Sequence, residues 1–180
     1  MIPLLPKSLR RSLLRRCYAV MASRPPDMRI GAAAQPYMLR WWILPRNRRF
    51  NIYLHDFRQD DDDRALHDHP WPSLSVLLRG ELIETYAPTP ALAADRAHQV
   101  TRTLARGSIV WRDPRFTHRL ALPRSPKTMD PVGAITLFIV GPRLREWGFW
   151  CPRASPAGGW RPWHKFVAPD NPGATGPGCE

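Results

Sequence analysis

The chain has 180 residues, of which 43% are hydrophobic, 10% aromatic and 23% charged. These values are typical of one globular domain and exclude both a membrane-embedded and a wholly disordered chain. Lys and Arg outnumber Asp and Glu by 27 to 15, a net charge of +12 that would suggest a nucleic-acid or anionic-membrane partner. Residues 1–50 hold eleven basic residues and one acidic residue, so the remainder of the chain is nearly neutral.

Residues 8–21 are predicted to form a basic amphipathic helix. Apolar side chains recur there at helical spacing, and arginines occupy the positions between them. The apolar residues are Leu9, Leu13, Leu14, Cys17, Tyr18 and Met21, and the arginines are Arg10, Arg11, Arg15 and Arg16. The arginines interrupt every apolar run that a secretory signal would need. The pattern favours a helix docked on its own domain, with a nucleic-acid or membrane surface and an organelle-targeting segment as alternatives.

Seven short strands are predicted after this helix, because short apolar runs lie between Gly, Pro or Asp residues. The runs are 38–44, 50–57, 74–78, 82–86, 108–112, 118–122 and 134–140. The 21 prolines also favour short strands over long helices. Strands at this spacing are typical of a sandwich or barrel. We therefore expect an all-β fold, a small antiparallel jelly-roll barrel with a short N-terminal helix.

The chain is predicted to divide into three parts. Residues 1–36 are the basic helix and a linker, and residues 37–149 form the barrel. Residues 150–180, rich in Pro, Gly and Trp, are expected to wrap the core and to fray at the end. Within the barrel, the acidic run 60–63 and the Ala/Pro-rich stretch 87–98 are expected to be exposed loops.

The three cysteines, Cys17, Cys151 and Cys179, show no CxxC spacing. Neither a disulfide framework nor a cysteine-based zinc site is therefore indicated. Free thiols fit a reducing compartment, so a cytoplasmic location is the default expectation. The sequence also holds no apolar run long enough for a transmembrane helix.

Three histidines are predicted to form a metal site. His67 and His69 are two residues apart, so their side chains point to the same face of a strand, and His118 begins another strand. Imidazole is the commonest metal ligand near neutral pH, and three nitrogens on one side of a metal leave positions for a substrate and O₂. A single strand histidine is more often a surface or core residue, and it is the combination that favours a metal. The histidines without such a context, expected to be structural or exposed, are His55, His98 and His164.

The first histidine segment resembles the first motif of the cupin superfamily. That motif is a His-x-His pair, three or four residues, a Glu, six residues and a Gly. Here the pair is His67-Asp68-His69, and Ser73 and Gly80 follow at the family's spacing. The acidic ligand of the family is thus replaced by serine.

The second motif of the superfamily opens with Gly, contains a proline turn and ends with His. Gly107, Pro114 and His118 match that outline, although Arg115 stands where the family usually has a second Gly. With the surrounding strands, the resemblance extends over about 50–141 of the chain.

A cupin without the glutamate resembles the three-histidine subgroup, to which thiol dioxygenases such as cysteine dioxygenase belong. This resemblance implies Fe(II) held by His67, His69 and His118, with Zn, Mn or Ni as alternative metals. It also implies O₂ and a small-molecule substrate as partners. Segments 67–81 and 141–150 also resemble small uncharacterised cupin-like proteins of bacteria and their phages, which implies a fold but no reaction.

Two further residues are candidates for catalysis. Strict alternation places Ser73 and Arg79 on the same strand face as the histidine pair. Ser73 could bond a metal-bound water or the substrate, or could simply make room as a small residue. Arg79 could bind a substrate carboxylate or phosphate, but pairing with Glu81 or Glu84 at the end of the barrel is the favoured alternative. The tryptophan-rich stretch 147–163 is expected to pack over the barrel, with a ligand-stacking wall as the alternative.

The leading functional hypothesis is a mononuclear non-haem Fe(II) dioxygenase, an oxidoreductase acting on a small anionic substrate. Neutral imidazoles leave the site at +2, which favours an anion. The first alternative is a metal-dependent isomerase or lyase of the same fold. The second is a nucleic-acid-associated module with a vestigial pocket, which the confined charge disfavours. Homodimers are common among cupins, but no interface is indicated here.

Overall fold

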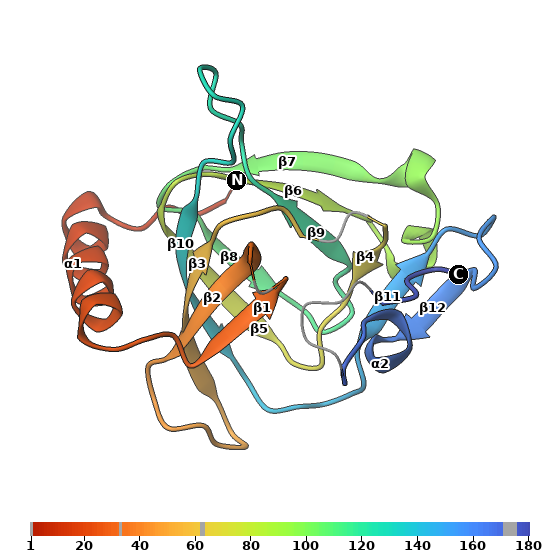
Figure 1. Cartoon of the computed structure of the whole chain (residues 1–180), viewed down its shortest axis with the longest axis horizontal. Coiled ribbons are helices and arrows are strands. Elements are labelled where there is room, and N and C mark those ends of the chain that lie inside the picture. The colour runs from red at the N-terminus through yellow and green to blue at the C-terminus, as the bar shows by residue number, and fades with distance from the viewer. Residues whose placement is uncertain (1, 33, 62–63, 171–175) are drawn as a thin grey trace.

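Two antiparallel sheets pack face to face in the computed structural model, which describes residues 2–32, 34–61, 64–170 and 176–180 (Figure 1). In spatial order, the first sheet contains β1 (Met28–Gly31), β2 (Pro36–Trp42), β3 (Asn51–Phe57), β10 (Ala134–Val140), β5 (Ser73–Arg79) and β8 (Ile109–Arg112). The second contains β12 (Gly159–Pro162), β11 (Gly148–Cys151), β4 (Leu66–His67), β9 (His118–Ala121), β6 (Leu82–Tyr86) and β7 (Val100–Leu104). The helical elements are α1 (Lys7–Ser23), α2 (Trp163–Phe166) and the 3₁₀ turns Pro90–Leu92 and Arg96–His98.

The chain alternates between the two sheets as it runs from β3 to β11. β3, β5, β8 and β10 lie in the first sheet, and β4, β6, β9 and β11 lie in the second; β7 stays beside β6. Such alternation of antiparallel strands defines a jelly roll, the double-stranded β-helix of cupins. The predicted all-β fold is confirmed. The acidic run lies only partly within the described residues, because 62–63 fall outside them.

Helix α1 lies against the outer face of the first sheet (Figure 1). Its apolar side chains pack there on a buried cluster of strand residues that includes Trp41 and Leu54. Arg10 on the helix also donates a hydrogen bond to the carbonyl of Leu78, at 2.9 Å. The helix therefore adopts the docked arrangement that the amphipathic pattern favours. Among the described residues, no helix is long and apolar enough to cross a membrane.

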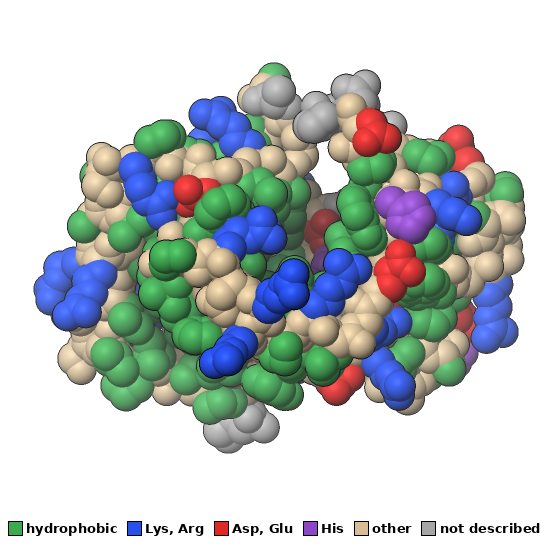
Figure 2. Space-filling view, turned by 90° about the horizontal axis from the view of Figure 1, so that it is seen from below, with side chains coloured by type: hydrophobic (Ala, Val, Ile, Leu, Met, Phe, Trp, Pro, Cys, Tyr) green, Lys and Arg blue, Asp and Glu red, His purple; other side chains and the backbone are tan. Residues whose placement is uncertain are grey.

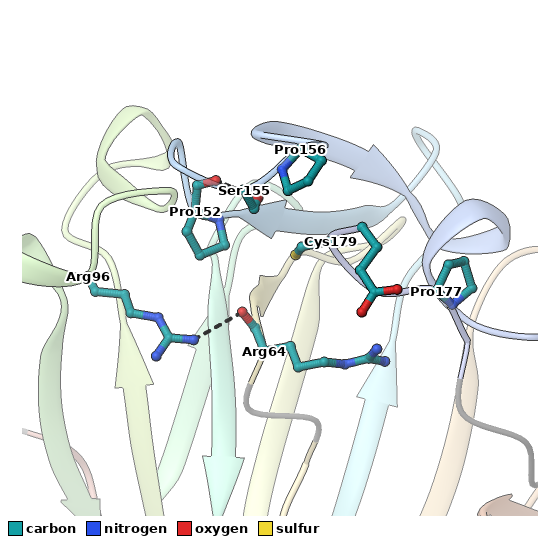
Figure 3. Close-up of a pocket in the computed structure, with 8 residues that line it drawn as sticks. Arg64, Arg96, Pro152, Ser155, Pro156, Pro177 and Cys179 are labelled. Carbon is teal, nitrogen blue, oxygen red and sulfur yellow. Dashed lines mark hydrogen bonds between the residues drawn. The ribbon is translucent and has the colours of Figure 1, made fainter.

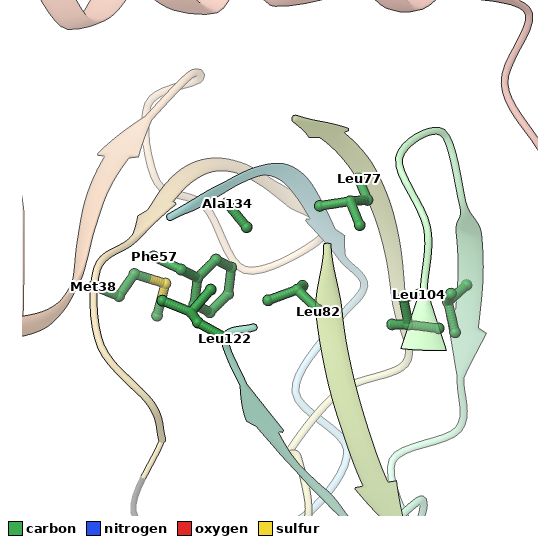
Figure 4. Close-up of a cluster of buried hydrophobic side chains, with 8 residues drawn as sticks. Met38, Phe57, Leu77, Leu82, Leu104, Leu122 and Ala134 are labelled. Carbon is green, nitrogen blue, oxygen red and sulfur yellow. The ribbon is translucent and has the colours of Figure 1, made fainter. Parts of the chain in front are cut away.

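The two ends of the barrel differ in chemistry. One end is filled by an apolar cluster (Figure 4), which consists of Met38, Phe57, Leu77, Leu82, Leu104, Val110, Leu122 and Ala134. Toward the other end the inner side chains become aromatic, with Tyr53, Phe138 and Val140 packed against Trp42 and Trp71. The interior is thus closed at one end, and the larger polar residues gather near the other.

The segment after residue 147 adds secondary structure that the sequence did not indicate. β11 and β12 form a hairpin that joins the second sheet through β4, with Phe149 opposite His67. The sequence predicted free thiols at Cys151 and Cys179, and this prediction is wrong. The two cysteines form a disulfide with a Cα–Cα distance of 5.4 Å. They are 28 residues apart, and only the return of the tail over β11 brings them together.

A shallow pocket of about 300 Å³ lies beside this disulfide (Figure 3). It is lined by Arg64, Arg96 and Cys179 among others, and Arg96 donates a hydrogen bond to the Arg64 carbonyl at 3.4 Å. None of its lining residues is a histidine. The pocket is therefore separate from the site that the sequence predicts.

Candidate metal centre

The three predicted ligands meet inside the barrel. β4 and β9 are paired so that His67 lies opposite His118, and His69 follows two residues after His67 on the same side. The three rings have centroids 5.0 to 5.2 Å apart. One ligand nitrogen from each residue lies within 4.8 Å of the others. The strand register, which pairs residues 51 positions apart, therefore builds a three-nitrogen cluster.

The spacing of these nitrogens fits a metal ion. Nε2 of His69 and Nε2 of His118 are 2.9 Å apart. Two nitrogens bound to one metal at about 2.1 Å and at right angles lie roughly 3.0 Å from each other. The pair therefore already has the separation of two adjacent ligands of an octahedral ion.

Two of the three imidazoles are held from behind by carboxylates. His118 Nδ1 contacts Glu84 Oε1 at 2.7 Å, and His67 Nδ1 lies 3.1 Å from Asp61 Oδ2. Each carboxylate favours the proton on Nδ1 and so leaves the Nε2 lone pair for a metal. Carboxylates behind ligating histidines are usual at metal sites, where they fix the tautomer and the ring orientation.

Glu84 is completely buried and has cationic neighbours on both oxygens. Arg112 donates from Nε at 2.8 Å, and Arg102 donates from Nε at 2.7 Å. Burial alone would raise the pKa of Glu84, but the hydrogen bond from His118 and the charges of Arg112 and Arg102 outweigh it and hold that pKa far below its usual range. Glu84 is therefore an anion at every physiological pH.

The environment also sets the protonation of the histidines. Burial, with the charge of Arg112, lowers the pKa of His118 to about 4, and burial with the neighbouring histidines takes the pKa of His69 well below its usual value. For His67, burial lowers the pKa, but Asp61 outweighs that effect and the net shift is upward. His69 and His118 are thus neutral at pH 7, the form that a metal needs.

Asp68, the residue between the paired histidines, binds the tail hairpin and not a ligand histidine. Asp68 is buried, and its carboxylate accepts hydrogen bonds from the Gly148 amide at 2.8 Å and from the indole N–H of Trp160 at 3.0 Å. It also forms an ion pair with Arg145 at 2.8 Å. The His-x-His segment is therefore fixed to the tail hairpin through its central residue.

The two residues predicted to act in catalysis lie at opposite ends of β5. Ser73 is buried at the first position, opposite Val140 and Arg112, and its hydroxyl has no hydrogen-bond partner among the described residues. Arg79 is exposed at the last position, beyond the apolar cluster. The structure brings Ser73 to the same end of the sheet as the metal centre and leaves Arg79 at the other end. A catalytic role for either residue stays a prediction.

A half-buried arginine that the sequence did not single out faces the barrel interior. Arg40, on β2, donates from Nε to His55 Nε2 at 2.9 Å, and its guanidinium lies 4.9 Å from the centroid of the Tyr53 ring. No Asp or Glu pairs with it in the part of the chain that the structure describes. Burial lowers the pKa of Arg40 to about 10, so the group remains a cation at neutral pH.

His55, the hydrogen-bond partner of Arg40, and the metal centre share one aromatic neighbour. The ring of Phe138 lies 5.2 Å from the His55 ring and 6.0 Å from the His69 ring. The hydroxyl of Thr136, which lies opposite His55 on β10, is buried without a hydrogen-bond partner among the described residues. A buried donor without a partner indicates a bound water or ligand. The interior beside the histidines therefore offers a cation and free hydrogen-bonding groups.

The face of the molecule at this end is hollowed near its centre, and Lys and Arg side chains lie beside the hollow (Figure 2). The hollow thus opens to solvent on a face that carries positive charge.

Comparison with known proteins extends only to the fold. No protein-family model and no curated protein matches the sequence. Among solved structures, the chain is similar to Fe(II) HppE in complex with its substrate, at 14% identity over 66% of this chain and 57% of that one, with a TM-score of 0.49. The chain thus spans a little over half the length of HppE.

Two further solved structures are similar at the same level. One is a cupin superfamily protein from Desulfitobacterium hafniense, at 15% identity over 58% of this chain and 76% of that one, with a TM-score of 0.41. The other is a conserved Klebsiella pneumoniae protein with a double-stranded β-helix domain, at 15% identity over 70% and 83%, with a TM-score of 0.43.

Proposed function

We propose that this protein is a metal-dependent enzyme of the cupin kind, a mononuclear non-haem Fe(II) oxygenase that acts on a small anionic substrate. The observation that carries the proposal is the three-histidine cluster, with carboxylates behind His67 and His118 and a half-buried cation on the same face of the first sheet. Fe(II) bound by three imidazoles supplies redox chemistry with O₂ at its open positions. Binding of the substrate and orientation of the three histidines depend on other residues of this chain.

Arg40 is the residue that we assign to the anionic group of the substrate. Its guanidinium is a planar fork suited to a carboxylate or phosphate, and one N–H is already engaged by His55. Because a half-buried charge without a counter-ion is poorly compensated, an anionic ligand would be favoured there. His55, which accepts from Arg40, is stacked on Tyr53 and also lies against Phe138, so aromatic rings surround this partner of the guanidinium.

Glu84 and Asp61 act on the ligands rather than on the substrate. Glu84 keeps His118 in the tautomer with a free Nε2, and Asp61 does the same for His67. Ser73 and Thr136 carry the free hydroxyl groups of the interior, which can orient a substrate or a water molecule.

The proposal is tested by purifying the protein without added metals and measuring its metal content. We expect about one iron per chain, lost in His67→Ala and in His118→Ala. His98→Ala is the matched control, because His98 is exposed and pairs only with Asp95, and this variant should keep its iron. Full metal occupancy in both ligand variants would overturn the proposal.

Oxygen uptake then separates oxidation from other metal chemistry. The iron-loaded protein should consume O₂ with an anionic substrate and should consume none after His118→Ala. Turnover of such a substrate without O₂ uptake would show a metal-dependent isomerase or lyase instead.

A further inference from the structure

The loop between β2 and β3 carries a dense group of exposed cations. Within residues 45–50 lie Arg46, Arg48 and Arg49, all exposed, and no acidic residue. None of the three forms an ion pair with a residue that the structure describes. Local like-charge repulsion of this kind is relieved when an anion binds.

This loop lies at the end of the barrel where the metal centre is. β3 begins at Asn51, which pairs with Val140, and Val140 pairs in turn with the buried Ser73. Two residues further along the same strands, Phe138 pairs with Tyr53 and contacts the His69 ring. The β2–β3 loop lies at the lower edge of Figure 1, the side from which Figure 2 is seen. The arginines therefore lie on the same side of the molecule as the hollow, beside which Lys and Arg side chains are visible in Figure 2.

The loop is held in one conformation by paired asparagines. The Asn47 amide donates to Asn51 Oδ1 at 3.0 Å, and Asn51 Nδ2 donates to the Asn47 carbonyl at 2.8 Å. The Asn47 side chain in turn accepts from the amides of Arg49 and Phe50, at 2.9 and 3.0 Å. The positions of the cations relative to the barrel are thus set before any ligand arrives, which lowers the entropy cost of binding.

Aromatic rings accompany these cations. The Arg46 guanidinium lies 5.1 Å from the centroid of the Trp42 ring, so one of its faces is covered while its N–H groups remain available in the plane. Phe50, in the same loop, is 44% exposed, a large fraction for an aromatic residue. An exposed ring beside several arginines can stack a base while the arginines bind phosphates. Arg143, after β10, adds an exposed cation from a second segment.

We infer that this rim, formed by Arg46, Arg48, Arg49, Phe50 and Arg143, binds the phosphates and the base of a nucleoside di- or triphosphate. The inference rests on the proposed function in one respect, because it takes the nucleotide to be part of the substrate of the metal centre. Binding of the nucleotide to the rim itself needs no metal. A single mononucleotide is favoured over a nucleic-acid strand because the loop's cations are confined to six residues. The exposed arginines of α1 lie instead on the helix that packs on the outer face of the first sheet (Figure 1), and Arg29 lies on the edge strand β1.

ADP titrated calorimetrically into the metal-free full-length protein tests the inference. The triple variant Arg46→Ala, Arg48→Ala, Arg49→Ala should bind ADP at least tenfold more weakly than the wild type. The matched control removes the same charge from α1, as Arg11→Ala, Arg15→Ala, Arg16→Ala, and should bind within twofold of the wild type. Phe50→Ala should weaken ADP binding and leave pyrophosphate binding unchanged.

The inference would be overturned if the wild type did not bind ADP, or if both triple variants lost ADP affinity equally. It would also be overturned if a single-stranded oligonucleotide bound more tightly than ADP and its binding needed the arginines of both the loop and α1. Thermal melts of each variant show that the fold is intact. Iron binding by the rim variant, measured separately, keeps the two proposals apart. If ADP binds as expected but His67→Ala keeps its metal, the proposed function fails and this inference stands.

Discussion

Glu84 occupies a position where one carboxylate stabilises three different groups. It bonds His118, Arg112 and Arg102, and its side chain is fully buried. A buried ion pair is strongly destabilised when one partner is removed, because the remaining charge is left without compensation. The same residue thus contributes to folding and to the geometry of the candidate metal centre.

Glu84→Gln should therefore lower both stability and metal affinity. We expect the free energy of unfolding to fall by about 3 kcal/mol, since Arg112 loses its counter-charge. Metal affinity should fall about 10- to 100-fold, as is usual when the partner of a ligating histidine is altered. Urea denaturation and competition with a chelator measure the two effects. Glu81→Gln, at an exposed position, should change neither, and an unaltered metal affinity in Glu84→Gln would contradict the role assigned here.

Arg112 and Arg40 should respond to the same substitution by different amounts. Arg112→Met removes a partner of Glu84 and should destabilise the protein by about 3 kcal/mol. Arg40→Met removes a half-buried cation that has no acidic partner among the described residues, and should change stability by about 1 kcal/mol or less. Chemical denaturation of both variants checks this. A large loss of stability in Arg40→Met would mean that Arg40 is a structural residue and not an anion site.

The site residues whose positions could be predicted are those that follow from the spacing within one strand or at the start of the next. Alternation along a strand puts His67 and His69 on one side, and the distance to the next strand start indicated His118. Glu84 and Arg40 lie in strands whose patterns do not distinguish an inward charge from an outward one. Their roles depend on register with partners far away in the chain, which only the folded structure fixes.

At the level of elements, the tail hairpin is joined to the barrel by the pairing of β11 with β4 and by Asp68, and the disulfide joins β11 to the C-terminal residues. Short strands between glycines and prolines were predictable in the barrel itself, where alternation is clear. β11 and β12 were not, because their strand character comes from the pairing of β11 with β4 and of β12 with β11, and not from an alternating pattern of their own.

Loss of the disulfide should destabilise the protein measurably. Closing a loop of 28 residues is worth about 3 to 4 kcal/mol by the chain-entropy relation. Cys179→Ser should show that loss in urea denaturation without reductant. Wild-type protein with reductant should match the variant, and a wild-type curve that reductant does not move would show that the bond does not form in the protein.

For the whole molecule, the basic residues of the first fifty positions are dispersed. Most lie on α1 or on the rim of the open end, Arg24 pairs with Asp27, Arg29 lies on β1, and Arg40 faces the barrel interior. Composition alone could give their number but not this distribution, because the fold separates residues that are neighbours in sequence.

Metal binding should raise the stability of the whole barrel, because the ligands come from strands that separate on unfolding. At a free metal concentration 100 times the dissociation constant, the gain is about 2.7 kcal/mol, or roughly 5 to 10 °C in melting temperature for a chain of this size. Calorimetry under anaerobic conditions with and without Fe(II) measures the shift. His118→Ala should show no shift, and an equal shift in that variant would place the metal elsewhere.

The alternation of side chains along an extended segment has one more effect at His67-Asp68-His69. With both imidazoles directed into the barrel, the aspartate between them must be directed outward, and it is there that the tail hairpin binds. Shortening the chain before β11 would remove the Gly148 and Trp160 donors of this carboxylate and leave it with Arg145, next to both ligands. Such a deletion would therefore disturb the site although it removes none of the three histidines.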